Sequence, residues 1–159
     1  MTPPEISEKL KTKFGDRILE VKTEGVVDQF VKVSPPAVAE VALFLRDDRD
    51  LAFDYLMCLS GVDYTKGVLG VVYHLCSMTK RHKITLKVDV PAVAPEVPSV
   101  ASTWPTADWH EREAWDMFGI VFKGHPDLRR ILLPEDYPGH PLRKDFKVPE
   151  FYQGMKVPY

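Results

Sequence analysis

A helix-like segment followed by a long, proline-interrupted tail constrains this chain more than any other feature. Residues 108–118 have a helical pattern, and Gly119 follows them. Six prolines then fall between Gly119 and Tyr159, which rules out a long helix or a central strand there. The tail nevertheless carries several large apolar residues: Phe122, Ile131, Leu132, Leu133, Tyr137 and Phe146. We therefore expect it to lie against the body of this chain or against a partner protein.

Composition indicates one globular domain without a nucleic-acid partner. The chain has 159 residues, of which 45% are hydrophobic, enough for a sizeable core. Its formal net charge is −2, and residues 109–159 contain eight basic and eight acidic residues. Proteins that bind nucleic acid normally carry a basic surplus or stripe. We expect no nucleic-acid binding.

Neither secretion nor membrane insertion is indicated by the sequence. Residues 1–13 are polar, with no apolar stretch of the kind found in signal peptides. No run of about twenty apolar residues is present, so we expect membrane contact only through partners. Cys58 and Cys76 lie in apolar segments and are expected to be reduced and buried. A disulfide between them is possible only if the two segments are neighbours.

Hydrophobic periodicity predicts a helix, a hairpin and a second helix in the first third of the chain. Apolar residues recur at helical spacing from Pro3 to Phe14, and Gly15 ends that pattern. Two strand-like segments, 17–23 and 26–33, flank a turn and predict a hairpin. Ser34 is a suitable N-cap, and Pro35 favours the start of a helix.

The middle of the chain predicts strands followed by helices. Val68 to Met78 has the composition of a central strand, and Lys83 to Val90 alternates like a half-buried antiparallel strand. We expect a short helix from Val97 to Trp104, then the helix 108–118. Asp108 or Thr106 is the expected cap of that helix, and Glu111 lies three residues after Asp108, the spacing of a capping box.

The predicted fold class is α+β: a mostly antiparallel sheet with helices packed on one face, followed by an extended, proline-rich C-terminal tail. We divide the chain into an α+β domain, residues 1–119, and an extended C-terminal segment, residues 120–159. That segment is predicted to dock on the domain and on a partner subunit.

Residues able to carry chemistry are sparse. His110, His125 and His140 are fifteen residues apart, and His110 and Glu113 could face one way on a helix. A small metal-dependent enzyme using His110, Glu113 and His125 is the alternative from another functional class. Two cysteines are too few for an ordinary iron–sulfur cluster, and residues 61–70 match no nucleotide-binding motif. We expect no cofactor, metal or catalytic residue in this chain.

Charged residues of both signs instead concentrate in the helix 108–118 and the tail. Arg112 and Asp116 are spaced to pair on one helix, but an exposed pair of this kind contributes only about 0.3–0.5 kcal/mol. Buried arginine–carboxylate contacts between helix and tail would matter more, since removing one partner costs about 3–5 kcal/mol. Arginines among aromatic residues are also typical of interface cores. An intramolecular scaffold and a docking surface both remain open.

The same region resembles a known family. Residues 111–146 are similar to the signature of the hydrophilic 30 kDa subunit of proton-pumping NADH:quinone oxidoreductase (respiratory complex I). The matching runs are Glu111-Arg112-Glu113, Asp116 to Gly119, His125-Pro126, Arg129 to Leu132, Pro141 to Phe146, and upstream Tyr73-His74-Leu75 and Pro98-Ser99-Val100.

This resemblance implies a structural role in the peripheral arm, on the cytoplasmic side of the bacterial inner membrane. It implies binding to the large subunit that bears the quinone site, and to neighbouring cluster-bearing subunits. Iron–sulfur clusters, FMN and the quinone site are expected in those partners. Related ferredoxin- or F420H2-linked dehydrogenases and membrane-bound hydrogenases contain a similar module. The candidate motif and interface residues are Glu111, Arg112, Glu113, Asp116, His125, Arg129, Arg130, Leu133, Pro141, Leu142, Arg143, Lys144, Asp145 and Phe146.

Overall fold

A five-stranded sheet forms the centre of the molecule. The computed structural model describes residues 1–157. In sheet order, the strands are β1 (Ile18–Lys22), β2 (Phe30–Val33), β5 (His82–Pro91), β4 (Val68–Ser77) and β3 (Tyr55–Asp63). Neighbouring strands are antiparallel except β2 and β5, which are parallel. The predicted α+β class with a mostly antiparallel sheet is confirmed, as are the hairpin β1–β2 and the interior position of β4.

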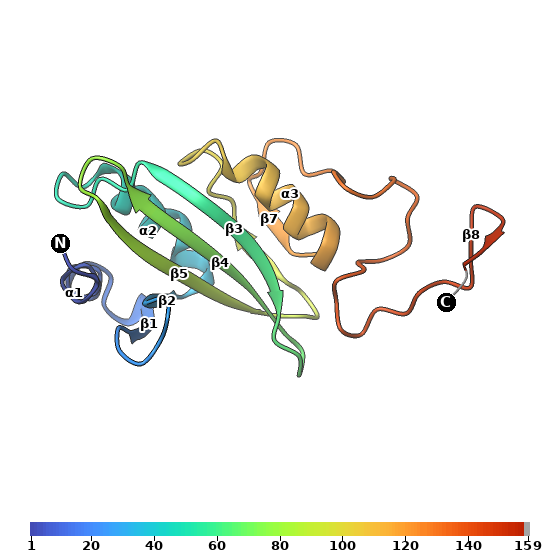
Figure 1. The fold of residues 1–159 in the computed structure, drawn as a ribbon, viewed down its shortest axis with the longest axis horizontal. Helices are drawn as coiled ribbons and strands as arrows, with labels where there is room; N and C mark the ends of the chain where they lie inside the picture. The colour runs from blue at the N-terminus through green and yellow to red at the C-terminus, as the bar shows by residue number, and fades with distance from the viewer. Residues whose placement is uncertain (158–159) are drawn as a thin grey trace.

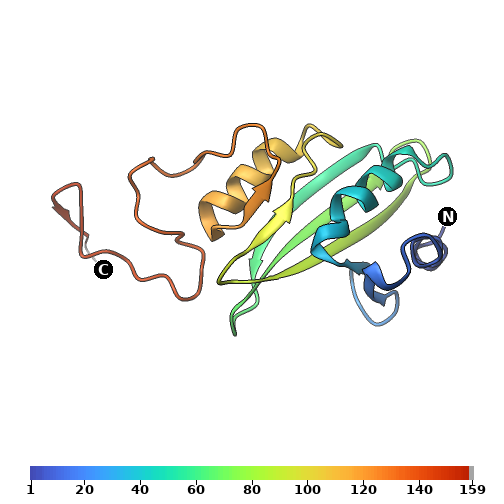
Figure 2. The same cartoon turned by 180° about the vertical axis from the view of Figure 1, so that it is seen from behind.

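One face of this sheet is apolar because the side chains of β4 and β5 alternate in register. Val71 lies opposite Val88, and Tyr73 lies opposite Leu86, all of them buried. Helices α1 (Pro3–Phe14) and α2 (Val38–Asp47) add their apolar sides to the same core. Figure 2 shows α2 across this face, whereas no helix crosses the front of β4 and β5 in Figure 1.

Helix α1 matches its predicted limits, whereas the start of α2 differs from the prediction. Gly15 follows α1 with a φ of 53°, a backbone conformation that favours glycine. Before α2, the short 3₁₀ helix η2 (Pro35–Ala37) occupies the expected first turn. Ser34 precedes η2 but makes no side-chain capping hydrogen bond. The predicted capping role of Ser34 is therefore wrong, although the proline does begin helical structure.

Two further elements correct the sequence prediction between residues 96 and 123. The expected helix from Val97 to Trp104 is absent; strand β6 (Glu96–Pro98) and turns take its place. β6 pairs in parallel with β7 (Val121–Lys123), which follows helix α3 (Ala107–Phe118). Three-residue strands are too short to show periodicity, so the sequence pattern does not reveal them. Figure 2 shows this β6–β7 pair on the same side of the sheet as α2.

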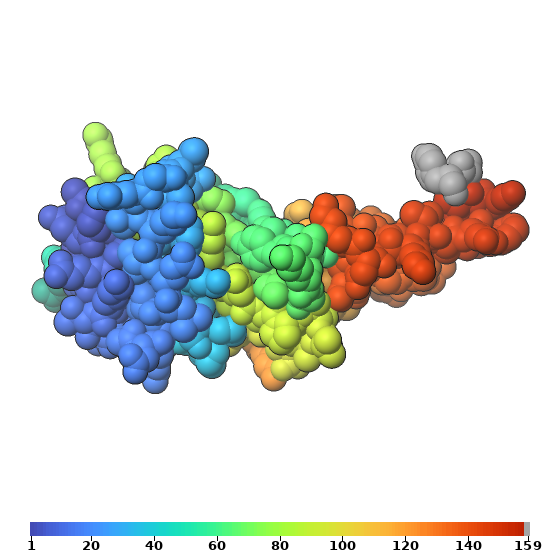
Figure 3. Space-filling model, turned by 90° about the horizontal axis from the view of Figure 1, so that it is seen from below, coloured from blue at the N-terminus to red at the C-terminus, as the bar shows by residue number. Residues whose placement is uncertain are grey.

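The chain beyond β7 is extended and projects from the body. Residues 124–150 contain no helix or strand, and a small hairpin of β8 (Phe151–Tyr152) and β9 (Met155–Lys156) follows. Figures 1 and 3 show this segment reaching away from the end that bears the N-terminus. Ile120 and Phe122 are buried in the core. The extended part therefore begins at Gly124, four residues after the boundary expected from the sequence.

Candidate functional site

The carboxylate of Asp116 is the point at which the tail folds onto α3. Asp116 is fully buried near the end of that helix. Its Oδ1 accepts a hydrogen bond from Nη1 of Arg130 at 2.6 Å, and its Oδ2 accepts the backbone N–H groups of Ile131, Leu132 and Leu133 at 3.1, 2.9 and 2.9 Å. Burial opposes ionisation, but these four donors outweigh it and lower the pKa of Asp116. The carboxylate is therefore charged at neutral pH.

Arg130 also connects two parts of the tail through hydrogen bonds. Its Nη2 donates to the carbonyl oxygens of Tyr137 and Gly139 at 2.8 and 3.2 Å. Its guanidinium also lies 5.9 Å from the centre of the Trp115 ring. The side chain is 12% exposed and bound to Asp116, so most of this charge is removed from water. A single arginine thus fixes one turn of the tail to α3 and to another turn of the tail.

Arg112 binds the tail through backbone carbonyls. Its Nε donates to the carbonyl of Arg129 at 3.2 Å, and its Nη2 donates to that of Arg130 at 3.1 Å. The predicted pair with Asp116 does not form, because that carboxylate is occupied by Arg130. Contact between helix and tail through a buried arginine–carboxylate pair was one of the two arrangements expected, and the arginine comes from the tail.

The C-terminal end of α3 is capped by the tail. The carbonyl of Asp116 accepts from Nδ1 of His140 at 3.0 Å, and that of Met117 accepts the N–H of Leu142 at 3.1 Å. Gly119 ends the helix with a φ of 75°, and a Cβ there would lie 2.7 Å from the His140 ring. Glycine is thus required twice, by the backbone conformation and by the neighbouring imidazole.

Farther along, the tail touches the end of the sheet. The N–H of Lys144 donates to Oδ2 of Asp63, the last residue of β3, at 2.8 Å. Nη2 of Arg143 donates to the carbonyl of Ala92 at 3.2 Å, and its Nε binds the exposed Asp145 at 3.2 Å. These contacts anchor residues 143–145 to the body of this chain.

Aromatic rings hold the outer part of the tail to itself. Tyr137 stacks on Phe146 with ring centres 6.4 Å apart, and it lies 5.3 Å from the ring of Tyr152. The hydroxyl of Tyr152 donates to Asp136 at 2.9 Å. Gly139 permits this packing, since a Cβ there would lie 3.0 Å from the Phe146 ring.

Glu111 and His125 join α3 to β6 and to the start of the tail. Glu111 is fully buried; its two carboxylate oxygens accept the Ser99 hydroxyl at 2.6 Å and the Val100 N–H at 2.7 Å. The predicted capping box at Asp108 is therefore wrong, because Glu111 points toward the chain after β6. Burial raises the pKa of Glu111 to about 7, against the lowering effect of these hydrogen bonds.

Although polar contacts fix the tail, many of its apolar side chains remain in water. Leu132 is 62% exposed, Leu142 51% and Phe151 60%; Val148 and Met155 are also exposed. Trp109, on the first turn of α3, is 69% exposed. Other large apolar residues, such as Leu19 and Leu43, are exposed on the body, but those of the tail follow one another along an extended segment, which is a suitable surface for another protein.

The remaining candidate residues vary in burial. Glu113 is exposed, and its side chain forms no hydrogen bond or ion pair with any residue from 1 to 157. Arg129 pairs with Asp127 at the surface. Leu133, Pro141 and Phe146 are half-buried, whereas Lys144 and Asp145 are exposed. The sequence did not predict that Asp63 would bind the tail or that His140 would bind α3. The only signal was a polar side chain next to a turn, for Asp63, or next to a glycine, for His140.

The metal-enzyme alternative is not supported by the positions of His125 and Glu113. Both ring nitrogens of His125 are engaged: Nδ1 accepts the N–H of Asp127 at 3.0 Å, and Nε2 donates to the carbonyl of Asp108 at 3.1 Å. Glu113 lies in solvent. Within residues 1–157, no three His, Cys, Asp or Glu side chains are arranged to hold a metal ion.

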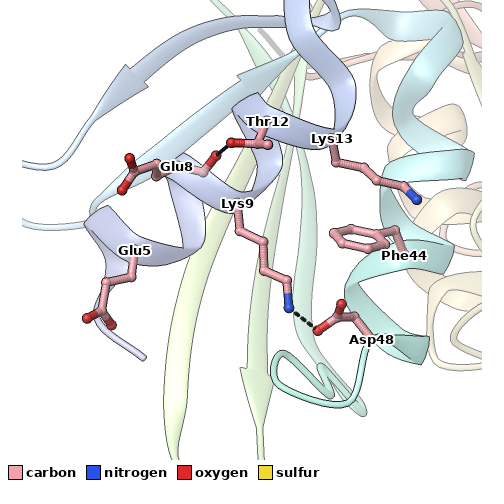
Figure 4. A pocket seen from close by; sticks show the side chains of 7 residues that line it. All are labelled: Glu5, Glu8, Lys9, Thr12, Lys13, Phe44 and Asp48. Carbon is pink, nitrogen blue, oxygen red and sulfur yellow. Dashed lines mark hydrogen bonds and ion pairs between the residues drawn. The ribbon is translucent and has the colours of Figure 1, made fainter.

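An open groove of about 600 Å³ lies between α1 and α2, away from the tail (Figure 4). Lys9 crosses it to Asp48 at 2.6 Å, and Lys13 lies 5.1 Å from the Phe44 ring. These contacts connect the two helices. We ascribe the groove to helix packing and assign it no chemistry.

Comparison with known proteins identifies the family. Residues 31–152 match the family described as the 30 kDa subunit of respiratory-chain NADH dehydrogenase. The chain belongs to this family. It is 53% identical over 151 residues to the corresponding NADH-quinone oxidoreductase subunit of Chloroherpeton thalassium, covering 94% of this chain and 63% of that relative. It is 48% identical to the same subunit of Chlorobium phaeobacteroides, covering 94% of this chain and 92% of that relative.

Two solved structures have the same fold. A trypsin-resistant fragment (1–134) of Nqo5 superposes with a TM-score of 0.65 at 28% identity; it covers 80% of this chain and 100% of the fragment. A chain of the membrane-bound sulfane sulfur reductase, an archaeal respiratory membrane complex, gives a TM-score of 0.74 at 23% identity, covering 91% of this chain and 85% of that chain. In this member of the 30 kDa family, none of the helices within residues 1–157 has the length and apolarity needed to span a bilayer.

Proposed function

We propose that this chain is a structural subunit of the peripheral arm of NADH:quinone oxidoreductase, with no redox centre of its own. In this proposal it braces the large quinone-site subunit and neighbouring cluster-bearing subunits on the cytoplasmic side of the inner membrane. FMN, iron–sulfur clusters and quinone belong to the partners. Family membership and the names of the two relatives support this assignment.

The observation that carries the proposal is that the tail has a fixed path and yet exposes apolar side chains. Residues 129–146 are held in a defined path by the buried Asp116 and Arg130, yet Leu132 and Leu142 remain largely in water. Exposed leucines along a fixed path supply apolar surface for a partner to cover.

Co-purification with a tagged quinone-site subunit tests the proposal. Leu132→Ser and Leu142→Ser should each reduce capture of that partner, because they remove apolar surface at the expected interface. Leu19→Ser is the matched control, since Leu19 is 57% exposed on β1, far from the tail. Equal capture by all three variants and the unmodified chain would contradict docking through the tail.

The choice among related complexes with different electron donors rests on the sequence identity of this chain to its relatives. Both relatives at about half identity are named for NADH-quinone oxidoreductase, whereas the sulfane sulfur reductase chain shares the fold at 23% identity. We therefore favour NADH over ferredoxin or F420H2 as the donor of the complex. Purification of the native complex and comparison of its oxidation rates for the three donors tests this choice.

A further inference from the structure

Three ionisable side chains meet where α3, β6 and the start of the tail come together. Nε2 of His125 lies 3.5 Å from Oδ1 of Asp108 and 4.0 Å from Oε2 of Glu111. The side chains of His125 and Glu111 are fully buried. Oδ1 of Asp108 is also buried, and no donor within residues 1–157 bonds to it. Two carboxylates thus lie within 4.0 Å of one imidazole nitrogen, and of the three side chains only that of Asp108, which is 36% exposed, reaches water.

The hydrogen bonds of His125 indicate a neutral ring. Nδ1 accepts the N–H of Asp127, so the ring proton resides on Nε2, where it is donated to the Asp108 carbonyl. A second proton on Nδ1 would point at the N–H of Asp127 and break that turn.

Glu111 can accept a proton without such a rearrangement. Its Oε2 lies 2.6 Å from the Ser99 hydroxyl, which can reverse its direction and accept. The groups that face Glu111 are Asp108 on its own helix, His125 beyond β7 and the Tyr73 hydroxyl on β4. Burial first, and then the charge of Glu111, raises the pKa of Tyr73, so that hydroxyl supplies no charge at neutral pH. No cation lies among these groups to favour the ionised carboxylate.

We propose that Glu111 is the proton-binding group of a pH-sensitive clasp, which holds the start of the tail more firmly to α3 and β6 when Glu111 is neutral. Ionised Glu111 and Asp108 repel each other, and water reaches neither the carboxylate of Glu111 nor Oδ1 of Asp108. Opening the contact around His125 admits water to both carboxylates. Ionisation therefore favours opening of residues 124–133, and protonation favours closure.

The pH window follows from linkage. In the closed form Glu111 titrates at about 7, and in the open form it titrates near its ordinary value of 4.5. The open population therefore rises from pH 5 to pH 7 and stays constant above that range. Full solvation of Glu111 on opening gives a rise of about tenfold or more across this interval. Asp116, whose pKa is lowered, contributes its own change at more acidic pH.

Hydrogen exchange of the isolated full chain tests the clasp. Rates for residues 125–133, corrected for the intrinsic effect of pH, should show this rise from pH 5 to pH 7 relative to amides of β4. Glu111→Gln keeps the hydrogen-bonding shape without the charge, and its rates should show no such rise. A Glu111→Gln profile that follows the unmodified chain, or an unmodified chain without the rise, overturns the proposal.

A second variant keeps the test decisive if Glu111→Gln does not fold. Asp108→Asn removes the neighbouring charge, which contributes to the raised pKa of Glu111. The pH at which the rise levels off should therefore move to lower pH, whereas a purely structural role would leave it in place. An unmoved midpoint contradicts the clasp. None of these measurements involves a partner protein, so their outcome is independent of the proposed function.

Discussion

Asp116 and Arg130 form a buried ion pair, 2.6 Å between Oδ1 and Nη1, that joins helix α3 to the tail. The other carboxylate oxygen accepts three consecutive backbone N–H groups of the tail. One side chain thus satisfies four donors that would otherwise lack partners beside the helix. This contact determines the path by which the tail leaves the body.

Asp116→Asn should destabilise the tail contact strongly. The variant leaves Arg130 buried without a counter-charge, and breaking a pair of this kind costs about 3–5 kcal/mol. Urea unfolding should report the loss, and residues 129–133 should become the first sites of proteolysis. Asp127→Asn is the control, because Asp127 pairs with Arg129 at the surface and should cost less than about 1 kcal/mol. Similar losses for the two variants would contradict the account of Asp116.

Gly119→Ala should be more harmful than Gly124→Ala. Both glycines have a positive φ, 75° and 82°, so both substitutions strain the backbone, by about 1–2 kcal/mol. Only at Gly119 would the new Cβ also meet a neighbour, the His140 ring at 2.7 Å. Thermal unfolding measures the stability of both variants, and the difference between their losses gives the cost of the contact with His140. Equal losses would show that His140 moves aside without cost.

Glu111→Gln should raise stability at pH 7.5 and have little effect at pH 4.5. The pKa of Glu111 is raised in the folded chain, so the unfolded chain loses its proton first and stability falls as pH rises from 4.5 to about 7. The shift from 4.5 to about 7 corresponds to about 3 kcal/mol at most. Chemical denaturation at the two pH values measures it. A variant less stable than the unmodified chain at pH 7.5 would refute this assignment.

A chain ending at Leu128 should remain folded, whereas one ending at Gly119 should not. The longer truncation removes Ile120 and Phe122, which are buried in the core, and losing a large core side chain costs about 2–5 kcal/mol. It also removes β7, the partner of β6. Circular dichroism and cooperative unfolding distinguish the two truncated chains. A cooperatively folded chain of residues 1–119 would restore the boundary expected from the sequence.

The spacing of apolar residues along the sequence was sufficient to predict helices and strands that bury one continuous apolar face. Helix α1, the alternation of Ile84, Leu86 and Val88, and the stop at Gly119 are of this kind. The β6–β7 pair was not predictable, because its strands are three residues long and separated by α3.

The sequence predicted which residues would take part in the site, but it did not predict which of them would contact each other. Glu111 had the spacing of a capping box, but its partners are Ser99 and Val100, more than ten residues earlier. Arg112 had the spacing to pair with Asp116, but that carboxylate is taken by Arg130. Long-range partners compete with local ones, and sequence spacing alone does not show which will prevail.

Hydrogen exchange of residues 129–157, measured in the isolated chain and in its complex with the quinone-site subunit, tests the central claim most directly. Docking of the tail on that partner predicts slower exchange in the complex for these residues, with the amides of β4 and β5 unchanged. Tail exchange that is already as slow as that of the sheet in the isolated chain, and unaltered by the partner, would contradict the claim.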